Sequence, residues 1–306
     1  MINLSLVIPI YNEERLVDKL LDESFSALKT VTEDFEIICV DDGSKDDSLE
    51  KLLNYKKRDD RLKIVSLSRN FGHQAAYTAG LEYSKGNYVV MMDGDLQDPP
   101  EIIKLMYEKL KGENLDVVFG HRRQRKEPLP KRLMIYSFHR IFNKLSNINA
   151  PANVGNFSIM SRKALNAFLG LKEKNRYLPG LRFFIGFKQG FVEYDRPDRK
   201  IGEAKMSFLK LLKLALDAIF SFSKLPIRIC LWVGMAGIVF SLVGITIVLI
   251  KKINGEAITG WTSILTSMYF LGSVQLLFLG IIGEYIHRIF VETQNRPIFI
   301  VKDFFD

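Results

Sequence analysis

Residues 89–98 read VVMMDGDLQD, an apolar run that ends in three carboxylates, Asp93, Asp95 and Asp98. A short run of this kind, bounded by Asp and Gly, is typical of a buried strand. Acids crowded at the end of a strand repel one another unless a cation or a ligand lies among them. The stretch therefore predicts a strand whose end carries a binding site.

Four further apolar runs have the same character, and helical patterns separate them. We predict strands at 4–10, 35–42, 62–68, 87–95 and 115–120. Between them we predict helices at Glu14–Lys29, Asp46–Lys57, His73–Ser84 and Pro99–Lys111, with Ser44 as the N-cap of the second helix. Strands that alternate with helices, several of them apolar on both faces, indicate βαβ units. The predicted fold class is α/β with a mainly parallel sheet.

Polar clusters follow four of the predicted strands. They are Pro9-Ile10-Tyr11-Asn12-Glu13, Asp41-Asp42-Gly43-Ser44, Ser68-Arg69-Asn70-Phe71-Gly72 and Asp93-Gly94-Asp95. Each cluster alone is ordinary turn chemistry, but ligands of parallel sheets bind at the carboxyl ends of the strands. Four clusters at one sheet edge therefore indicate a binding crevice. Because no Gly-x-Gly-x-x-Gly follows the first strand, a dinucleotide site is not expected.

The apolar residues of the 306-residue chain are unevenly distributed. Ile229–Ile250 and Ala257–Gly283 contain no charged residue, and each exceeds the roughly 20 residues that a helix needs to cross a bilayer. We predict two transmembrane helices; the alternative is a buried helical hairpin in a soluble protein. The N-terminus lacks a basic n-region and is not expected to be a signal peptide. Two cysteines without metal-binding spacing suit a reducing compartment.

The net charge is +8, and basic residues gather in 121–140 and just before the first apolar stretch. Basic flanks favour the cytoplasmic side of a membrane and anionic headgroups, although Lys251 and Lys252 lie in the connecting loop. We therefore expect residues 1–225 and the C-terminus to lie in the cytoplasm. No nucleic-acid-binding motif accompanies the charge, so no nucleic-acid partner is expected.

The Asp-x-Asp pair at a strand end suits a hard divalent cation. Mg²⁺ or Mn²⁺ takes few protein carboxylates and fills its remaining positions with water and phosphate oxygens. A diphosphate bound to such an ion becomes a good leaving group, because the charge that develops on it is neutralised. Alone, the Asp-x-Asp pair is a weak signal of a metal site, so the other sequence segments around the predicted site have to be considered.

Those neighbours resemble one enzyme family. The segments VIPIYNEE, VDDGSKDDS, SRNFGHQAAYTAGL and MDGDLQDPPE, in this order, are similar to family 2 glycosyltransferases of the GT-A fold. The later segment RFFIGFKQGFVEYDRPDRKIGEAKMS, followed by two apolar stretches, resembles the bactoprenol-phosphate glycosyltransferases, relatives of dolichol-phosphate mannose synthase. The resemblance covers essentially the whole chain. It implies inverting transfer of a sugar, with UDP-hexose preferred, from a nucleotide-sugar to a polyprenyl phosphate such as undecaprenyl phosphate.

The resemblance also implies roles for individual residues. Pro9, Tyr11, Asn12, Glu13, Asp41, Asp42 and Asp93 would bind the nucleotide-sugar. Asp93, Asp95 and Gln97 would hold Mg²⁺ or Mn²⁺ and the donor diphosphate. Arg122, Arg132 and Lys205 match positions at which such enzymes grip phosphate, and with Asp93 and Asp95 they form the expected catalytic set. Ala204 stands where the family usually has a serine beside that lysine.

The chemistry of a phosphate acceptor agrees with these charges. A polyprenyl monophosphate is already anionic near neutral pH, so it needs no general base. It does need cations that offset its repulsion from the anionic donor, and arginine matches phosphate geometry. Many relatives carry an acid in a Gly-Asp-Phe segment where this chain has Gly155-Asn156-Phe157. Because Asn156 cannot act as a base, we expect it to contact the sugar or the acceptor.

The expected organisation has four parts. Residues 1–206 form the cytoplasmic GT-A domain, 207–225 an amphipathic helix at the membrane surface, 226–287 the transmembrane hairpin and 288–306 a tail. Residues 296–301 are expected to pair as a strand with an edge of this sheet or a neighbour's, and a homo-oligomer is expected because similar enzymes are oligomeric. Three alternative functions remain: a GDP-mannose-dependent mannose synthase, a processive polysaccharide synthase, and a non-catalytic lipid- or nucleotide-binding membrane partner. A processive synthase normally carries a Gln-x-x-Arg-Trp motif, which this chain lacks.

Overall fold

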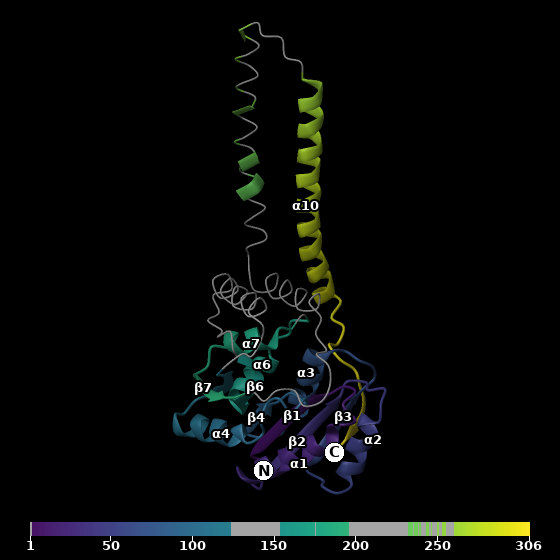
Figure 1. The fold of residues 1–306 in the computed structure, drawn as a ribbon, viewed down its shortest axis with the longest axis vertical. Coiled ribbons are helices and arrows are strands. Elements are labelled where there is room, and N and C mark those ends of the chain that lie inside the picture. Colours follow the sequence, from purple (N-terminus) through teal and green to yellow (C-terminus); the bar gives the residue numbers. More distant parts are fainter. Residues whose placement is uncertain are drawn as a thin grey trace. The chain divides into compact units, whose positions relative to one another are not determined.

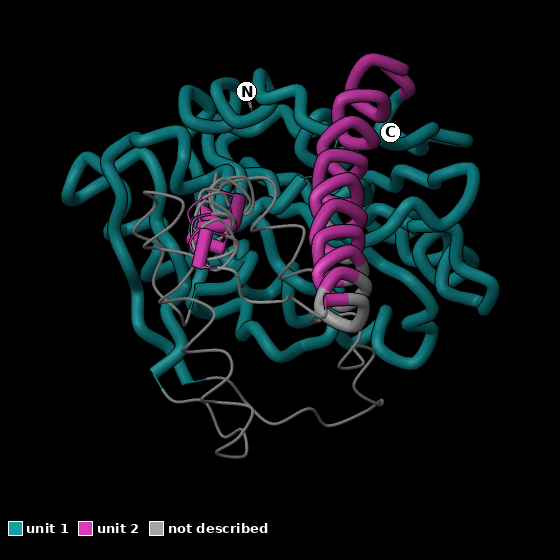
Figure 2. Tube along the Cα trace, turned by 90° about the horizontal axis from the view of Figure 1, so that it is seen from above, with its two compact units in different colours: residues 1–208, 297–306 teal, residues 209–296 magenta. Residues whose placement is uncertain are grey.

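The structure is a computed structural model of the chain. It describes residues 2–123, 154–174, 176–195 and 260–306, together with scattered helical positions between 232 and 254. The chain divides into two compact units (Figure 2): unit 1 comprises Met1–Phe208 and Pro297–Asp306, and unit 2 comprises Leu209–Arg296. Unit 1 contains the whole described sheet.

One sheet organises unit 1 (Figure 1), with the strand order β7-β5-β6-β4-β1-β2-β3-β8. The strands are β1 (Leu4–Ile10), β2 (Phe35–Asp41), β3 (Leu62–Leu67), β4 (Tyr88–Met91), β5 (Val117–Arg122), β6 (Val154–Ser161), β7 (Gln189–Tyr194) and β8 (Val301–Phe305). The β1–β2, β1–β4, β2–β3 and β5–β7 pairs are parallel, whereas β6 and β8 run antiparallel to their neighbours. The predicted mainly parallel α/β sheet is confirmed.

Helices cover both faces of the sheet. They are α1 (Val17–Lys29), α2 (Ser48–Lys56), α3 (His73–Tyr83), α4 (Ile102–Gly112), α6 (Arg162–Leu169) and α7 (Leu178–Phe184). The apolar sides of α1, α2 and α4 share one buried cluster with alternate residues of β1 such as Leu6 and Ile8. Helix α3 packs on the opposite face, and a Cβ at its Gly80 would lie 2.4 Å from Cγ1 of Val7. Both β1 and β2 are buried along their whole length, which explains why they read as continuous apolar runs.

The predicted helices and strands lie close to where the sequence indicates, but their ends differ by a few residues. Strand β5, for example, ends at Arg122 rather than at residue 120. Strand β4 ends at Met91 rather than at residue 95, so the Asp-Gly-Asp turn lies outside the strand. The predicted Ser44 cap is wrong, because α2 begins at Ser48 with Asp47 in the N-cap position. The Ser44 hydroxyl instead accepts a hydrogen bond from the Asn12 N–H at 3.0 Å.

The last strand is displaced from the predicted segment 296–301. Strand β8 runs from Val301 to Phe305 and pairs antiparallel with β3, the edge of the parallel part of the sheet. Asp306, which follows it, forms ion pairs with Lys63 at 2.5 Å and Lys85 at 3.3 Å. These charges lie beyond the apolar run from which the strand was predicted, and they favour the shifted register.

Unit 2 contains the long helix α10 (Trp261–Thr293). Within it, Phe270–Thr293 is the one helical segment among the described residues that is long and apolar enough to cross a membrane, judged by length and composition. The helix continues beyond the predicted boundary at residue 287, and an ion pair between Arg288 and Glu284, 2.8 Å apart, supports its last turns. The first predicted span and the amphipathic segment 207–225 lie mostly or wholly outside the described residues.

Candidate active site

The carboxyl ends of β1 and β4 meet at the point where the strand order reverses. From β1 the chain proceeds outward to β2 and β3, and then returns to place β4 on the other side of β1. Such a switch point opens a crevice for ligands in α/β sheets. Gly94, in the turn after β4, packs closely against the end of β1. A Cβ at this position would lie 3.0 Å from the carbonyl oxygen of Pro9. The predicted Pro9 and Asp93-Gly94-Asp95 segments are therefore neighbours.

Hydrogen bonds join the loops after β1 and β2. Asn12, which adopts a left-handed backbone with φ of 53°, donates its N–H to Ser44 and accepts the Lys45 N–H on its side-chain oxygen at 2.9 Å. The Glu13 N–H donates to the Ser48 hydroxyl at 2.8 Å. Asn12 and Glu13, two members of the predicted nucleotide-binding set, thus fix the loop after β1 against the loop after β2, and Tyr11 is half-buried.

Asp41 and Asp42 are both buried and both bind backbone. Asp41 Oδ1 accepts the Ser44 N–H at 3.1 Å. The Asp42 carboxylate accepts the N–H groups of Phe71 and Gly72 at 2.7 and 2.9 Å, which ties β2 to the loop before α3. Burial raises the pKa of Asp42, although these two hydrogen bonds act in the opposite direction.

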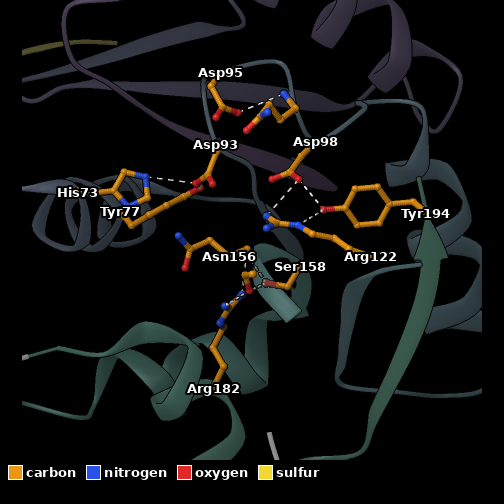
Figure 3. A network of polar contacts seen from close by, with 12 residues as sticks. His73, Tyr77, Asp93, Asp95, Asp98, Arg122, Asn156, Ser158, Arg182 and Tyr194 are labelled. Atoms are coloured by element: carbon orange, nitrogen blue, oxygen red, sulfur yellow. Dashed lines mark hydrogen bonds and ion pairs between the residues drawn. The ribbon is translucent and has the colours of Figure 1, made fainter. Parts of the chain in front are cut away.

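Asp93 is held by two side chains from the first turns of α3. Tyr77 donates its hydroxyl to Asp93 Oδ1 at 2.7 Å, and His73 Nε2 lies 3.2 Å from the same oxygen (Figure 3). Burial alone would raise the pKa of Asp93, but the hydrogen bonds from His73 and Tyr77 and the charge of Arg122 outweigh it and hold that pKa well below its usual range. Burial opposes protonation of His73, yet Asp93 raises the pKa of His73 overall. Asp93 is therefore ionised at neutral pH.

The donor set at the end of β4 fits a hard divalent cation. Asp95 and Asp93 point to the same region in Figure 3, and the Gln97 N–H donates to Asp95 Oδ1 at 3.1 Å. No group of three or more His, Cys, Asp or Glu side chains suited to a metal occurs in the part of the chain that the structure describes. Two carboxylates and an amide oxygen nevertheless suffice for Mg²⁺ or Mn²⁺ when phosphate oxygens complete the shell. The predicted set of Asp93, Asp95 and Gln97 is compatible with that arrangement.

Arg122 lies at the end of β5, and a buried pair holds it. Its Nη2 lies 3.6 Å from Asp98 Oδ1, and its Nε donates to the Tyr194 hydroxyl at 3.1 Å. Tyr194 in turn donates its hydroxyl to Asp98, whose side chain is fully buried. Burial lowers the pKa of Arg122, but Asp98 and Tyr194 raise it more, so the guanidinium stays charged. This geometry presents a fixed cation across from the Asp93 carboxylate (Figure 3).

Asn156 lies near the start of β6, below Asp93 and Arg122 in the view of Figure 3. Its side-chain oxygen Oδ1 is enclosed and has no hydrogen-bond partner among the described residues. Its backbone carbonyl accepts a hydrogen bond from Arg182 Nη1 at 2.6 Å. An enclosed amide oxygen with unused capacity is suited to a ligand hydroxyl.

The structure brings together the described members of the predicted set, whereas Arg132 and Lys205 lie outside the described residues. Four further side chains at the site were not predicted from the sequence: His73, Tyr77, Tyr194 and Arg182. His73 and Tyr77 carry a usable signal, since they are spaced i and i+4 in the first turns of a helix that follows a strand end. Tyr194 and Arg182 come from β7 and α7, which no local pattern connects to the site.

Comparison with known proteins agrees with this geometry. Residues 5–169 match glycosyl transferase family 2, and residues 225–289 match the GtrB C-terminal hairpin. The first match spans more than half of the chain, and the chain belongs to glycosyl transferase family 2. It is a glycosyltransferase, as the sequence predicted.

Full-length relatives support the assignment. An uncharacterized glycosyltransferase of Synechocystis sp. (strain ATCC 27184 / PCC 6803 / Kazusa) is 40% identical over 99% of this chain and 95% of that protein. The prophage bactoprenol glucosyl transferase homolog of Escherichia coli (strain K12) is 37% identical, and the match covers 98% of each chain. The predicted resemblance to bactoprenol glycosyltransferases is thereby confirmed.

A solved structure supports the fold. Glucosyl-3-phosphoglycerate synthase from Mycobacterium tuberculosis, in complex with Mn²⁺, uridine diphosphate and phosphoglyceric acid, matches with a TM-score of 0.51 and 17% identity. The match covers 71% of this chain and 76% of that chain. The predicted GT-A-like architecture is confirmed at the level of the fold; of the two predicted transmembrane helices, one candidate lies among the described residues.

Proposed function

We propose that this glycosyltransferase moves a hexose from a UDP-sugar to a polyprenyl monophosphate such as undecaprenyl phosphate. The observation that carries the proposal is the location, at one switch point, of the ionised Asp93 carboxylate and of the charged Arg122 guanidinium, which Asp98 and Tyr194 hold in place. The carboxylate side suits a metal-bound diphosphate, and the arginine side suits a second phosphate. The full-length match to a bactoprenol glucosyl transferase homolog supports a lipid-phosphate acceptor.

On the donor side, the loops after β1 and β2 would enclose the base and ribose. Pro9, Tyr11, Asn12, Glu13, Asp41 and Asp42 are the candidate residues. Hydrogen bonds join these two loops in one arrangement, which would lower the cost of ordering them when a ligand binds. Asp93, Asp95 and Gln97 would hold Mg²⁺ or Mn²⁺, which when bound neutralises the charge on the leaving diphosphate.

On the acceptor side, Arg122 would bind the incoming phosphate, with Arg132 and Lys205 as further cations. The phosphate oxygen attacks the anomeric carbon directly, and the bond to the nucleoside diphosphate breaks on the opposite face with inversion. No residue has to remove a proton, because the nucleophile is already an anion. The neutral Asn156 is compatible with this reaction, and its enclosed oxygen would accept a hydrogen bond from a sugar hydroxyl.

The enzyme would work at the cytoplasmic face of a membrane. The apolar segment Phe270–Thr293 supports an integral anchor, and the match of residues 225–289 to a C-terminal hairpin supports a second span. An amphipathic helix over 207–225 would bring the catalytic domain, residues 1–206, to the lipid phosphate. We also propose that the enzyme forms a homo-oligomer.

A product assay tests the proposal. Purified protein is incubated with polyprenyl phosphate and a panel of UDP- and GDP-sugars, and lipid-linked product is detected by mass. We expect product with a UDP-hexose, and the inactive control is Asp95→Asn. Product with GDP-mannose alone would favour a mannose synthase, and no lipid-linked sugar from any donor would contradict the proposal.

A further inference from the structure

Arg182, on α7, is fully buried and is among the largest side chains without solvent exposure. No Asp or Glu forms an ion pair with it in the described part of the chain. Its guanidinium donates instead to the carbonyl oxygens of Gly155 and Asn156 and to the Ser158 hydroxyl, and its Nε to Leu178 O at 3.3 Å. Burying a charge is costly unless its hydrogen bonds are fully used. The location of this cation therefore calls for a functional reason.

Arg182 makes its hydrogen bonds to Gly155 and Asn156 in a part of β6 that is not paired with a neighbouring strand. Pairing of β6 with β4 ends at Ser158, and pairing with β5 jumps from Ser158 to Val154 across an irregularity. Residues 155–157 thus have no register partner on either described neighbour. A bulge of this kind re-aims side chains and is common beside active sites. The planar fork of Arg182 reaches the oxygens of Gly155 at 2.7 Å and Asn156 at 2.6 Å and fixes the bulge.

The same bulge lies against the Arg122 guanidinium. A Cβ at Gly155 would lie 2.7 Å from Arg122 Nη2 and 3.3 Å from Arg122 Cζ. Figure 3 shows Arg122 on one side of this segment and Arg182 on the other, with the Asn156 side chain beside them. A displacement of the Gly155–Asn156 backbone therefore moves both the phosphate-binding cation and the amide.

We propose that Arg182 is a positioning residue for sugar transfer: it fixes the Gly155–Asn156 bulge and thereby places the Arg122 guanidinium and the Asn156 amide. This inference rests on the proposed function. Burial lowers the pKa of Arg182 to about 10, so the side chain remains protonated at neutral pH. The negative charge of Asp93 acts against this decrease and raises the pKa of Arg182.

The chain offers a matched control. Arg176 is also a buried arginine, and its Nη2 donates to the carbonyl oxygens of Phe168 at 3.2 Å and Leu171 at 2.9 Å. It lies over the Phe168 ring rather than against β6. Arg182→Met and Arg176→Met each remove one buried guanidinium and retain a long, flexible side chain. They differ in whether the bulge at 155–157 loses its hydrogen bonds.

Two measurements decide the proposal. The first is hydrogen exchange of the peptide 154–161, which we expect to accelerate in Arg182→Met and not in Arg176→Met. The second is steady-state kinetics: a misplacement of about 1 Å in a reacting group can cost about 100-fold in rate. We expect Arg182→Met to lose about that factor in kcat with little change in KM for the donor, and Arg182→Lys to recover part of it. Arg176→Met should keep its kcat.

Several results would overturn the inference. They are unchanged exchange at 154–161 in Arg182→Met, a kcat equal to that of the parent protein, or equal losses in the two Met variants. If Arg182→Met does not fold, Gly155→Ala replaces it, because the added methyl group displaces Arg122 while Arg182 stays; kinetics like those of the parent protein would then refute the coupling. Absence of sugar transfer by the parent protein would contradict the proposed function, while hydrogen exchange would still decide the positioning role.

Discussion

Replacing Tyr194 by Phe removes one hydroxyl from the centre of the Arg122 site. That hydroxyl donates to Asp98 and accepts from Arg122 Nε, whereas the ring, which packs against Phe157 at 5.5 Å between centroids, stays. The change therefore separates the polar contribution of Tyr194 from its packing. We expect both the stability of unit 1 and the rate of sugar transfer to fall.

The size of the loss follows from the partners. A hydrogen bond to a charged group contributes about 1.5–3 kcal/mol, and two such bonds are lost. The ion pair between Asp98 and Arg122, with 3.6 Å between Oδ1 and Nη2, remains in the variant. We therefore take the lower value for each of the two lost hydrogen bonds and expect the free energy of unfolding to fall by about 3 kcal/mol. For a domain of about 150–250 residues, each kcal/mol lowers Tm by about 2–4 °C. The expected decrease in Tm is about 6–12 °C.

Thermal unfolding followed by circular dichroism on purified, detergent-solubilised protein measures this decrease. The control is Thr78→Val, which removes a single uncharged hydrogen bond, from the Thr78 hydroxyl to the Gln74 carbonyl oxygen 2.8 Å away. That variant should lose only about 1 kcal/mol. Equal decreases in Tm for the two variants would refute the charge-assisted network that we describe around Arg122.

Three further predictions concern other parts of the molecule. Gly43→Ala should destabilise the protein more than Gly72→Ala in thermal unfolding, because both residues have positive φ but only a Cβ at Gly43 would meet backbone, 2.6 Å from the Arg69 carbonyl carbon. Asn156→Asp and Asn156→Ala should fold and retain measurable turnover in the product assay, with altered sugar preference. The hydrogen bond from Arg61 lowers the pKa of Asp59, so Asp59 stabilises the fold above about pH 4 and loses this effect as the pH falls through its lowered pKa. Asp59→Asn should remove that part of the acid sensitivity.

Each of these predictions has a contrary outcome. Equal Tm values for the two glycine variants would show that the loop after β2 tolerates a side chain. Complete loss of turnover in both Asn156 variants, with folding intact, would make that side chain essential rather than selective. If Asp59→Asn loses as much stability between pH 5 and pH 3 as the parent protein does, the acid sensitivity comes from other carboxyl groups.

The local pattern of apolar residues was sufficient to predict the strands at the parallel end of the sheet. Strands β1, β2 and β3 are buried on both faces, so their apolar runs stand out, and the helices between them carry one apolar side. Two strands were not predicted: β6, which runs antiparallel to its neighbours, and β7, which pairs parallel with β5. Half-buried residues interrupt the apolar run of β6, most of β7 is half-buried or exposed, and the partner strands of both lie far away in the sequence.

The same distinction applies to the site. Asp93 and Asp95 could be predicted because they follow a strand directly, and the strand-end rule applies to any parallel sheet. Tyr194 could not, because its contact with Asp98 joins residues 96 positions apart. Arg182 is a buried cation whose partners are backbone carbonyl oxygens, and no side-chain pattern in the sequence reveals such an arrangement.

The most direct test is the rate of sugar transfer by protein stripped of metal with a chelator. With UDP-hexose and polyprenyl phosphate present, we expect transfer to stop and to return when Mg²⁺ or Mn²⁺ is added back, and we expect Asp95→Asn to gain nothing from the added ion. Transfer at full rate by the metal-free protein would contradict the role assigned to the Asp93–Asp95 pair.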